Sequence, residues 1–396
     1  MSKPLAGISV LEIGHILSGP FCTMILSDLG ARVIKIERPG HGDEARRLGP
    51  RVRGDSAYFI SVNRGKKSIT IDLGREEGQK LAFALSQKFD VIVENFVPGT
   101  MERFKLDYAR LKPLNPRLVY VSISGFGQNG PYARNPALDT IVQAMGGIMS
   151  LTGEPNGPPV RPGASLGDSI AGLFAATAIQ AALLERVRTG IGCYLDISML
   201  DCQVTIMENA FARFFAGEMP TPLGSRHPAA VPFQAFSTLD GYIVVALLSD
   251  NSMLWNSFCT AIDHPELASD SRFSTASARL QNQETLVPLI EEAMHRKSSQ
   301  EWVRELTKLE IPCGPVNSID AVAKDPQVLH RGMITQIPHK SLGRWSVANT
   351  PFRFDGTPSQ PQGPAPELGE HSEEILHEML GMSPLEFARL KSIGVV

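Results

Sequence analysis

The sequence predicts an α/β fold in which helices cover both faces of a parallel sheet, together with a smaller α/β unit. Three observations support this prediction. Short β-branched strands alternate with amphipathic helices in the first half of the chain, as in parallel sheets. The length of 396 residues is enough for two domains or one large one. Two proline-rich stretches, 216–234 and 351–366, indicate linkers.

Each element follows from hydrophobic periodicity and turn residues. In the first half we expect strands at 8–13, 33–36, 91–93, 118–123 and 194–198, and helices over 20–29, 76–89 and 168–189. Later we expect a hairpin over 236–247 and helices near 252–263, 283–297, 299–309 and 372–380. The longest apolar run, 170–184, is shorter than the roughly 20 residues that cross a bilayer, which favours a buried core helix.

Charge and cysteine content exclude several classes of protein. The chain has 38 Lys+Arg against 41 Asp+Glu and a net charge of −3, so it has no general attraction to nucleic acid or to an anionic membrane. Its five cysteines include no CxxC pair and no histidine at metal-ligand spacing, which indicates reduced thiols and no metal site. Residues 1–4 lack the apolar stretch of a signal peptide. We therefore expect a cytoplasmic protein, and from its size an enzyme.

A glycine-rich motif follows the strand at 118–123. Gly125, Gly127 and Gly130 match the GxGxxG pattern of dinucleotide sites. Such a site also needs a helix that begins at the motif and directs its N-terminus at the pyrophosphate. Pro131 and Pro136 follow instead, so we expect a glycine-rich turn in a loop.

Positive charge concentrates between residues 32 and 67. This segment holds ten basic and four acidic residues, a local excess of +6 in a chain of net charge −3. One interpretation is a solvated face with an incidental excess. The position after the early strands, where α/β sheets bind ligands, favours a site for a small molecule that carries phosphate.

Asp168 is the candidate nucleophile, because it lies where the glycine-rich loop 163–167 meets the long helix. A plain N-cap, worth about 1 kcal/mol, is the structural alternative. At an ordinary pKa of about 3.9 the carboxyl would be more than ~99.9% ionised at pH 7, and the helix dipole would favour the anion further. His15 is either a turn residue or a ligand contact. The sequence has no GxSxG or HExxH motif, so serine-hydrolase and zincin sites are not indicated.

A series of short motifs, in a fixed order, resembles one family over residues 5–396. These motifs are at 10–12, 18–20, 33–40, 63–68, 93–99, 124–131, 143–147, 167–168, 311–316, 325–326 and 368–372. They resemble the family III CoA-transferases, the group of formyl-CoA and carnitine CoA-transferases and α-methylacyl-CoA racemases. The resemblance implies an interlocked homodimer, in which each chain is an open ring threaded through its partner's.

The resemblance also implies the domains. It implies a Rossmann-like large domain from 1–200 and 351–396, a small domain over 225–325, and linkers at 201–224 and 326–350. The family's aspartate corresponds to Asp168, which favours the nucleophile over the cap. The positions that contact CoA correspond to Leu17, Ser18, Arg38, Ile71, Asp72, Leu73, Gly74, Asn95, Phe96, Val97, Arg103, Leu138 and Asp139, with His15 as a neighbouring candidate. The basic segment would then bind the phosphates of CoA.

The chemistry implied by the resemblance is covalent catalysis. Asp168 attacks an acyl-CoA thioester, which gives an aspartyl–acyl anhydride and CoA thiolate. The thiolate attacks the aspartyl carbonyl to form an aspartyl-CoA thioester and release the first acid. The acceptor carboxylate displaces CoA in a second anhydride, and the thiolate takes the new acyl group. CoA and acyl-CoA are substrates, and no permanently bound cofactor or metal is expected.

Departures from the family motifs narrow the subtype. Leu138 stands where racemases of this fold carry a catalytic histidine, which disfavours a racemase. Leu17 stands where formyl-CoA transferases carry glutamine, and their tetraglycine loop is missing, which disfavours formate–oxalate exchange. We expect a longer substrate, such as a C4–C5 dicarboxylic or hydroxy acid, with Arg46 or Arg47 as the carboxylate partner. An acyl-CoA racemase and a catalytically degenerate CoA-binding protein remain the alternatives.

Overall fold

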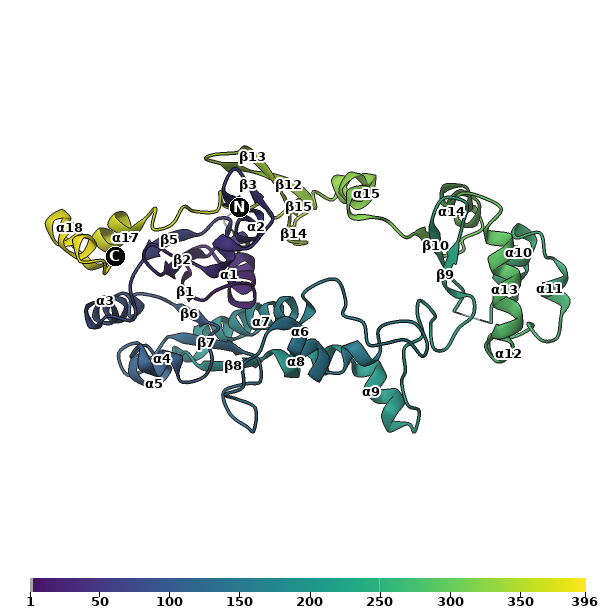
Figure 1. Cartoon of the computed structure of the whole chain (residues 1–396), viewed down its shortest axis with the longest axis horizontal. Helices are drawn as coiled ribbons and strands as arrows, with labels where there is room; N and C mark the ends of the chain where they lie inside the picture. The colour runs from purple at the N-terminus through teal and green to yellow at the C-terminus, as the bar shows by residue number, and fades with distance from the viewer. Residues whose placement is uncertain (1–2, 249) are drawn as a thin grey trace. The chain divides into compact units, whose positions relative to one another are not determined.

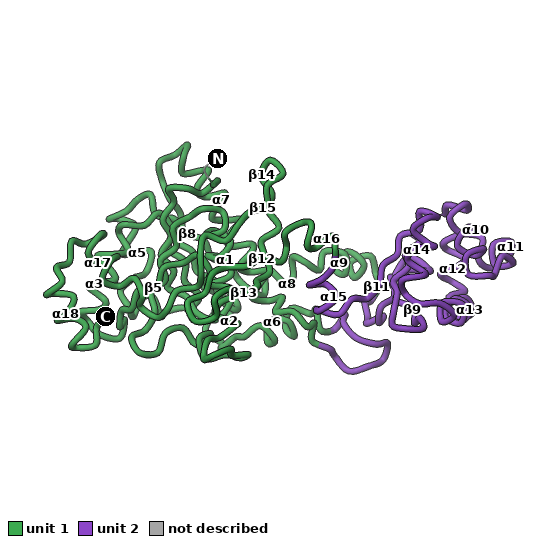
Figure 2. The backbone as a smooth tube through the Cα atoms, turned by 90° about the horizontal axis from the view of Figure 1, so that it is seen from above, with its two compact units in different colours: residues 1–149, 161–218, 326–396 green, residues 150–160, 219–325 purple. Residues whose placement is uncertain are grey.

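A computed structural model, which describes residues 3–248 and 250–396, divides the chain into two units (Figures 1 and 2). Unit 1 comprises 1–149, 161–218 and 326–396, and unit 2 comprises 150–160 and 219–325. The predicted α/β fold with a parallel sheet is confirmed. The domain borders differ from the predicted ones, since residues 150–160 belong to unit 2, where the Gly224 amide donates to the Gly153 carbonyl. The predicted linkers 201–224 and 326–350 contain helices and a hairpin of unit 1.

Unit 1 is built on a parallel sheet with the strand order β5-β2-β1-β6-β7-β8. Its strands are β1 (Ser9–Ile13), β2 (Arg32–Glu37), β5 (Lys67–Thr70), β6 (Val91–Glu94), β7 (Val119–Ser124) and β8 (Tyr194–Ser198). The sequence did not indicate β5, because only one of its four residues is a large apolar one. The chain runs outward from β1 through β2 to β5 and then returns to β6, so the strand order reverses between β1 and β6.

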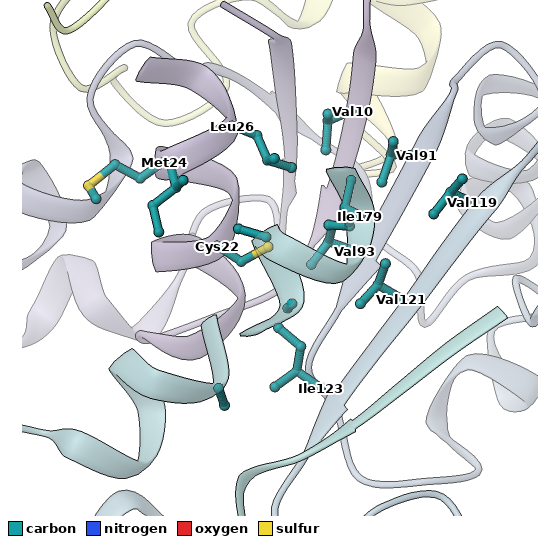
Figure 3. Close-up of a cluster of buried hydrophobic side chains, with 14 of the residues drawn as sticks. Val10, Cys22, Met24, Leu26, Val91, Val93, Val119, Val121, Ile123 and Ile179 are labelled. Atoms are coloured by element: carbon teal, nitrogen blue, oxygen red, sulfur yellow. The ribbon is translucent and has the colours of Figure 1, made fainter. Parts of the chain in front are cut away.

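Helices cover both faces of this sheet. The helices of unit 1 are α1 (Ser18–Asp28), α2 (Ala57–Asn63), α3 (Glu76–Ser86), α4 (Thr100–Arg103), α5 (Tyr108–Leu111), α6 (Asp139–Met145), α7 (Leu166–Thr189), α8 (Met199–Ile206), α9 (Glu208–Phe215), α16 (Pro326–His330), α17 (Ser372–Leu380) and α18 (Pro384–Ser392). Alternate strand residues such as Val93 and Val121 face α1 and α7, where Cys22 is buried in the same core (Figure 3). Their neighbours Ile92 and Tyr120 face α3, α5 and α17 on the other side.

Helix α7 is a core helix of unit 1, as predicted. Within the described residues, it is the helix that is long and apolar enough to cross a membrane by length and composition alone. It packs instead against α1 and the sheet through Ala171, Ala175 and Ile179, which are fully buried. Gly172 allows this contact, because a Cβ there would lie 2.8 Å from the Ser18 carbonyl oxygen of α1.

The C-terminal segment closes the outer edge of the sheet at β5. The amide of His371 donates to the Ser68 carbonyl at 2.9 Å, and the amide of Thr70 donates to the Ser372 hydroxyl at 3.0 Å. An unpaired strand edge can pair with other chains, and this contact covers the edge at β5.

The remaining elements of unit 1 are η1 (Glu44–Arg47), η2 (Ile148–Ser150) and the two-stranded pairs β3 (Arg51–Val52) with β4 (Asp55–Ser56), β12 (Ile334–His339) with β13 (Gly343–Ala348), and β14 (Arg353–Phe354) with β15 (Thr357–Pro358).

Unit 2 has its own core. An antiparallel sheet of β9 (Phe233–Ser237), β10 (Tyr242–Ala246) and β11 (Cys313–Pro315) is the predicted hairpin with one added strand. The helices are α10 (Ser252–Ala261), α11 (Glu266–Ser269), α12 (Ala276–Gln281), α13 (Gln283–Met294), α14 (Ser299–Lys308) and α15 (Ile319–Lys324). Trp255, Phe258 and Trp302 fill the space between sheet and helices.

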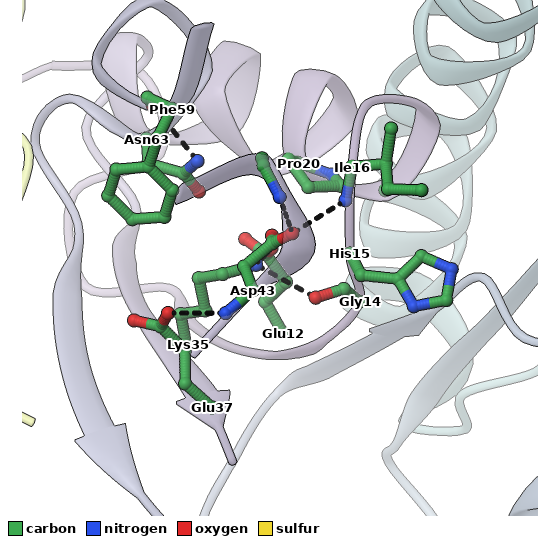
Figure 4. Close-up of polar contacts among 12 residues, drawn as sticks. Glu12, Gly14, His15, Ile16, Pro20, Lys35, Glu37, Asp43, Phe59 and Asn63 are labelled. Atoms are coloured by element: carbon green, nitrogen blue, oxygen red, sulfur yellow. Dashed lines mark hydrogen bonds and ion pairs between the residues drawn. The ribbon is translucent and has the colours of Figure 1, made fainter. Parts of the chain in front are cut away.

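A cluster of buried charges joins β1 and β2 to the segment that follows β2 (Figure 4). The Glu12 carboxylate in β1 lies 2.5 Å from Lys35 Nζ and 2.7 Å from Lys66 Nζ. Lys35 Nζ also lies 2.8 Å from Asp43 Oδ2. Although burial alone would raise the pKa of Glu12, the two ammonium groups lower it below its ordinary value.

The ion pairs correct the interpretation of the basic segment. Six of its ten cations are paired with acids: Arg32, Lys35, Arg46, Arg64, Lys66 and Lys67. The exposed remainder is Arg38, Arg47, Arg51 and Arg53. Lys35, Arg64 and Lys66 are buried in their pairs, so part of the excess charge is internal structure. Their acids Glu12 and Asp28 lie outside the segment in sequence and beside it in space.

Replacing Glu12 with alanine should lower the free energy of unfolding by about 3–5 kcal/mol, because Lys66 would stay buried without its anion and Lys35 would keep only Asp43. Chemical denaturation followed by circular dichroism measures this change. The control is Glu76→Ala, which removes an exposed ion pair with Lys80 and should leave stability unchanged. Equal stability of the two variants would show that the cluster is not a structural support.

Candidate active site

The site lies where the strand order of the sheet reverses. The connections after β1 and β6 leave these neighbouring strands toward opposite sides, which opens a crevice at their carboxyl ends. His15, Ile16 and Ser18 line one wall, and residues 95–97 line the other. Ligands of open α/β sheets bind at such points, so the fold itself places the candidate site.

A cavity of about 380 Å³ occupies this crevice. Eight predicted site residues line it: His15, Ser18, Asn95, Phe96, Val97, Arg103, Leu138 and Asp168. Leu17 is buried behind the wall, and Asp139 lies under the start of α7. Arg38 and residues 71–74 follow β2 and β5, farther along the same edge of the sheet and outside the lining.

The Asn95 side chain holds the two walls together. Its Oδ1 accepts a hydrogen bond from the His15 amide at 2.8 Å, and its Nδ2 donates to the His15 carbonyl at 2.9 Å and to Ser18 Oγ at 3.0 Å. A Cβ on Gly14 would lie 2.9 Å from Asn95 Oδ1, so glycine is required for this approach. Both amide hydrogens of Asn95 are therefore used within the protein, which makes it a support of the cavity wall.

Asp168 is the third residue of α7. The alternative that it serves as the N-cap of this helix is therefore wrong. The helix begins at Leu166, two residues earlier than expected, and Ser165 is the N-cap. Asp168 lies one turn before Gly172, on the face of α7 that meets α1. The close contact at Gly172 thus places the carboxylate beside Ser18, the first residue of α1.

Partial burial raises the pKa of Asp168. Loss of solvent and, secondly, the nearby Asp139 carboxylate raise the pKa of Asp168 to about 6, whereas hydrogen bonds from the Ser18 side chain and backbone oppose the rise. The expectation of an ordinary pKa is therefore wrong. A carboxyl of pKa near 6 is still about 90% ionised at pH 7. Such perturbed groups in clefts are candidates for chemistry.

The Asp139 side chain holds the start of α7 in place through a hydrogen bond to its backbone. Its carboxylate accepts hydrogen bonds from the Gly167 amide at 2.9 Å, from Gln143 Nε2 at 2.8 Å and from Arg161 Nη2 at 2.8 Å. Neither Gln143, which lies in the family motif at 143–147, nor Arg161 was among the site residues expected from the sequence. The spacing of Asp139 and Gln143, four residues apart on α6, could have suggested a pair on one helix face.

Asp43 is a second support that the sequence did not indicate. Its Oδ1 accepts from the Ile16 amide at 2.9 Å. Ile16 has a φ of +61°, an unfavourable backbone conformation for a β-branched residue, and it lines the cavity. The fixed carboxylate, itself 2.8 Å from Lys35 Nζ, maintains this strained conformation.

Tyr58 is also close to the carboxylates. Burial, followed by the charges of Asp168 and Asp139, raises the pKa of Tyr58 to about 12, so its phenol remains a hydrogen-bond donor at neutral pH.

Residues 125–138 form a loop without a helix, as predicted for the glycine-rich motif. No cluster of three or more His, Cys, Asp or Glu side chains that could hold a metal occurs among the described residues.

The chain is similar to several known proteins over nearly its whole length. The human succinyl-CoA:glutarate CoA-transferase is 37% identical over all of this chain and 90% of that protein. The acetyl-CoA:oxalate CoA-transferase of Acetobacter aceti is 41% identical over 95% of each chain. A crystal structure of a CAIB/BAIF family protein from Brucella suis superposes with a TM-score of 0.87 at 39% identity and covers 96% of this chain and all of that one.

The family model described as CoA-transferase family III matches residues 5–372, nearly the whole chain. With this match and with relatives above 30% identity over nearly the full length of the chain, the chain belongs to CoA-transferase family III.

Proposed function

We propose that the protein moves CoA from a dicarboxylic acyl-CoA to a free dicarboxylic acid, with Asp168 as the covalent nucleophile. The observation that carries this proposal is the position of Asp168, which is partly buried yet largely ionised in a cavity at the point where the strand order reverses. The relatives named above support the substrate class, because succinyl-CoA, glutarate and oxalate appear in their names.

The residues around Asp168 fit the proposed covalent steps. One carboxylate oxygen attacks the thioester carbonyl, the C–S bond breaks, and the CoA thiolate leaves with the electron pair. Ser18 donates hydrogen bonds to the carboxylate from the N-terminus of α1, which holds it in one orientation. The apolar wall formed by Phe96 and Met199 limits the access of water to the anhydride.

Arg47 is the proposed partner of the distal carboxylate. Of the two arginines considered, Arg46 is occupied, because its guanidinium lies 2.7 Å from Glu37 and stacks on Phe59. Arg47 is exposed at the end of η1, the short helix that Asp43 anchors to the cavity wall. We infer that residues from the basic segment such as Arg38 contact the phosphates of CoA.

We also infer an interlocked homodimer in a reducing compartment such as the cytoplasm. Helices α7 and α9 expose apolar side chains, including Leu184, Val187 and Phe215, which a second chain would cover. All five cysteines are free thiols, which suits a reducing compartment. Leu138 lines the cavity at the position of the racemase histidine, so α-proton exchange is disfavoured.

The variant Asp168→Ala should lose CoA transfer by at least about a thousandfold, because the nucleophile is absent. Incubation with succinyl-CoA and trapping with hydroxylamine, followed by mass spectrometry, should label Asp168 in the wild type alone. The matched control is Glu386→Ala, which removes an exposed acid at the third position of α18. Turnover by Asp168→Ala close to that of the wild type would rule out the mechanism.

The rate should fall on the acid side of pH 6, because Asp168 must be ionised to attack. We expect kcat/KM for acyl-CoA to be half-maximal near the pKa of about 6 and then to fall about tenfold per pH unit. Asp139→Asn removes the charge that helps to raise this pKa and should move the midpoint to lower pH. A wild-type midpoint near the ordinary value of about 3.9 would contradict the role assigned to burial.

Glutarate should be a better acceptor than pentanoate, which has the same chain length and one carboxylate, by at least about tenfold in kcat/KM. Arg47→Ala should reduce this preference by removing the proposed ion pair. Arg53→Ala, in the same segment, is the control, since its guanidinium donates to the Ser341 carbonyl. Equal use of both acids by the wild type would refute the dicarboxylate proposal.

A further inference from the structure

One polar side chain in the cavity wall lacks a partner in the described part of the chain. Ser124 ends β7 and is 6% exposed, and its hydroxyl is buried without a hydrogen bond. Leaving a buried hydroxyl unpaired is unfavourable, because the group has given up its hydrogen bonds to water, so such groups are rare in folded proteins. The cost would be offset if a ligand accepts a hydrogen bond from this hydroxyl.

The backbone holds Ser124 in a fixed place. Ser124 pairs with Ser198 of β8, and the carbonyl of Gly125 accepts from the Leu200 amide at 3.0 Å. A Cβ on Gly125 would lie 2.1 Å from Ala137 Cβ, so the chain is packed tightly directly after the serine. The hydroxyl is therefore positioned before any substrate arrives.

The neighbouring serine on the same strand face shows the contrast. Ser122, two residues earlier, accepts a hydrogen bond from the Tyr194 hydroxyl at 3.0 Å and is hydrogen-bonded to Glu94. Ser124 lines the cavity that contains Asp168 and Val97, whereas Ser122 does not. Of these two serines, the one with the unpaired hydroxyl is thus the one that lines the cavity proposed for the substrate.

We propose that Ser124 is a substrate-binding residue whose hydroxyl donates a hydrogen bond to a carbonyl oxygen of the bound acyl-CoA. This proposal rests on the proposed function, because that function fills the cavity with acyl-CoA. Two carbonyls have the required acceptor chemistry: the thioester carbonyl of the acyl group and an amide carbonyl of the pantetheine arm. The experiment below separates them.

The test compares full-length Ser124→Ala with the wild type, using succinyl-CoA as donor and glutarate as acceptor. Loss of one hydrogen bond between neutral groups should lower kcat/KM for succinyl-CoA about three- to tenfold. The stability of Ser124→Ala should not fall, because its hydroxyl has no partner in the free enzyme. The control Ser86→Ala removes a buried hydroxyl that donates to the Phe83 carbonyl at 2.8 Å, and should lose stability while keeping kcat/KM.

Binding of free CoA, measured by calorimetry, distinguishes the two acceptors. A rise in the Kd for CoA equal to the loss in kcat/KM assigns the hydroxyl to the pantetheine arm. An unchanged Kd together with a reduced kcat/KM assigns it to the acyl carbonyl. Either result supports the proposal.

If the Kd for CoA and kcat/KM for succinyl-CoA are both unchanged in Ser124→Ala, the proposed role of Ser124 is overturned, while the proposed transferase function is not affected. A wild type without transfer activity would refute the proposed function instead. The Kd values of succinyl-CoA for the wild type and for Ser124→Ala then decide the role of the hydroxyl. Equal values, or no binding to either protein, would overturn it.

Discussion

The structure of the site depends on the buried Glu12 carboxylate and the two lysines that neutralise it. Lys35 joins β1 to β2 and also donates to the Gly14 carbonyl at 2.8 Å, while Lys66 donates to the Pro20 carbonyl at 2.9 Å. These contacts hold both ends of the loop that follows β1. Removing one member of such a group leaves an uncompensated charge, so the group acts as a unit. The cavity wall is therefore fixed from inside the core.

Two opposing influences set the reactivity of Asp168. Burial destabilises its anion, whereas the Ser18 hydrogen bonds at the N-terminus of α1 stabilise it. The close approach of α1 and α7 at Gly172 produces both effects, because it excludes water and brings Ser18 to the carboxylate. The result is a carboxyl group that is ionised at neutral pH without being strongly stabilised.

The sequence predicted the fold well where short-range signals are strong. The apolar runs of β1, β6 and β7 and the long apolar helix α7 were located to within two residues. Strand β5 was missed, because its pairing with β2 depends on the sheet around it and not on its own four residues. The ion pairs of Lys35 and Lys66 were also missed, since their acids are distant in sequence. Asp168 was singled out by its position between the glycine-rich loop and the long helix, and the family motif favoured it as the nucleophile, but its pKa depends on burial that no local pattern encodes.

The interrupted layout of unit 1 has a consequence for biosynthesis. A ribosome releases β5 long before residues 369–374, which cover that edge, because all of unit 2 is translated between them. During this interval the nascent sheet has an open strand edge, a template for pairing with other chains. Unit 2 consists of the continuous segment 219–325 and the short segment 150–160. All of it is translated before the C-terminal part of unit 1, so it can fold before unit 1 is complete. Truncation near the C-terminus would therefore make the protein prone to aggregation even though the cavity residues are all present.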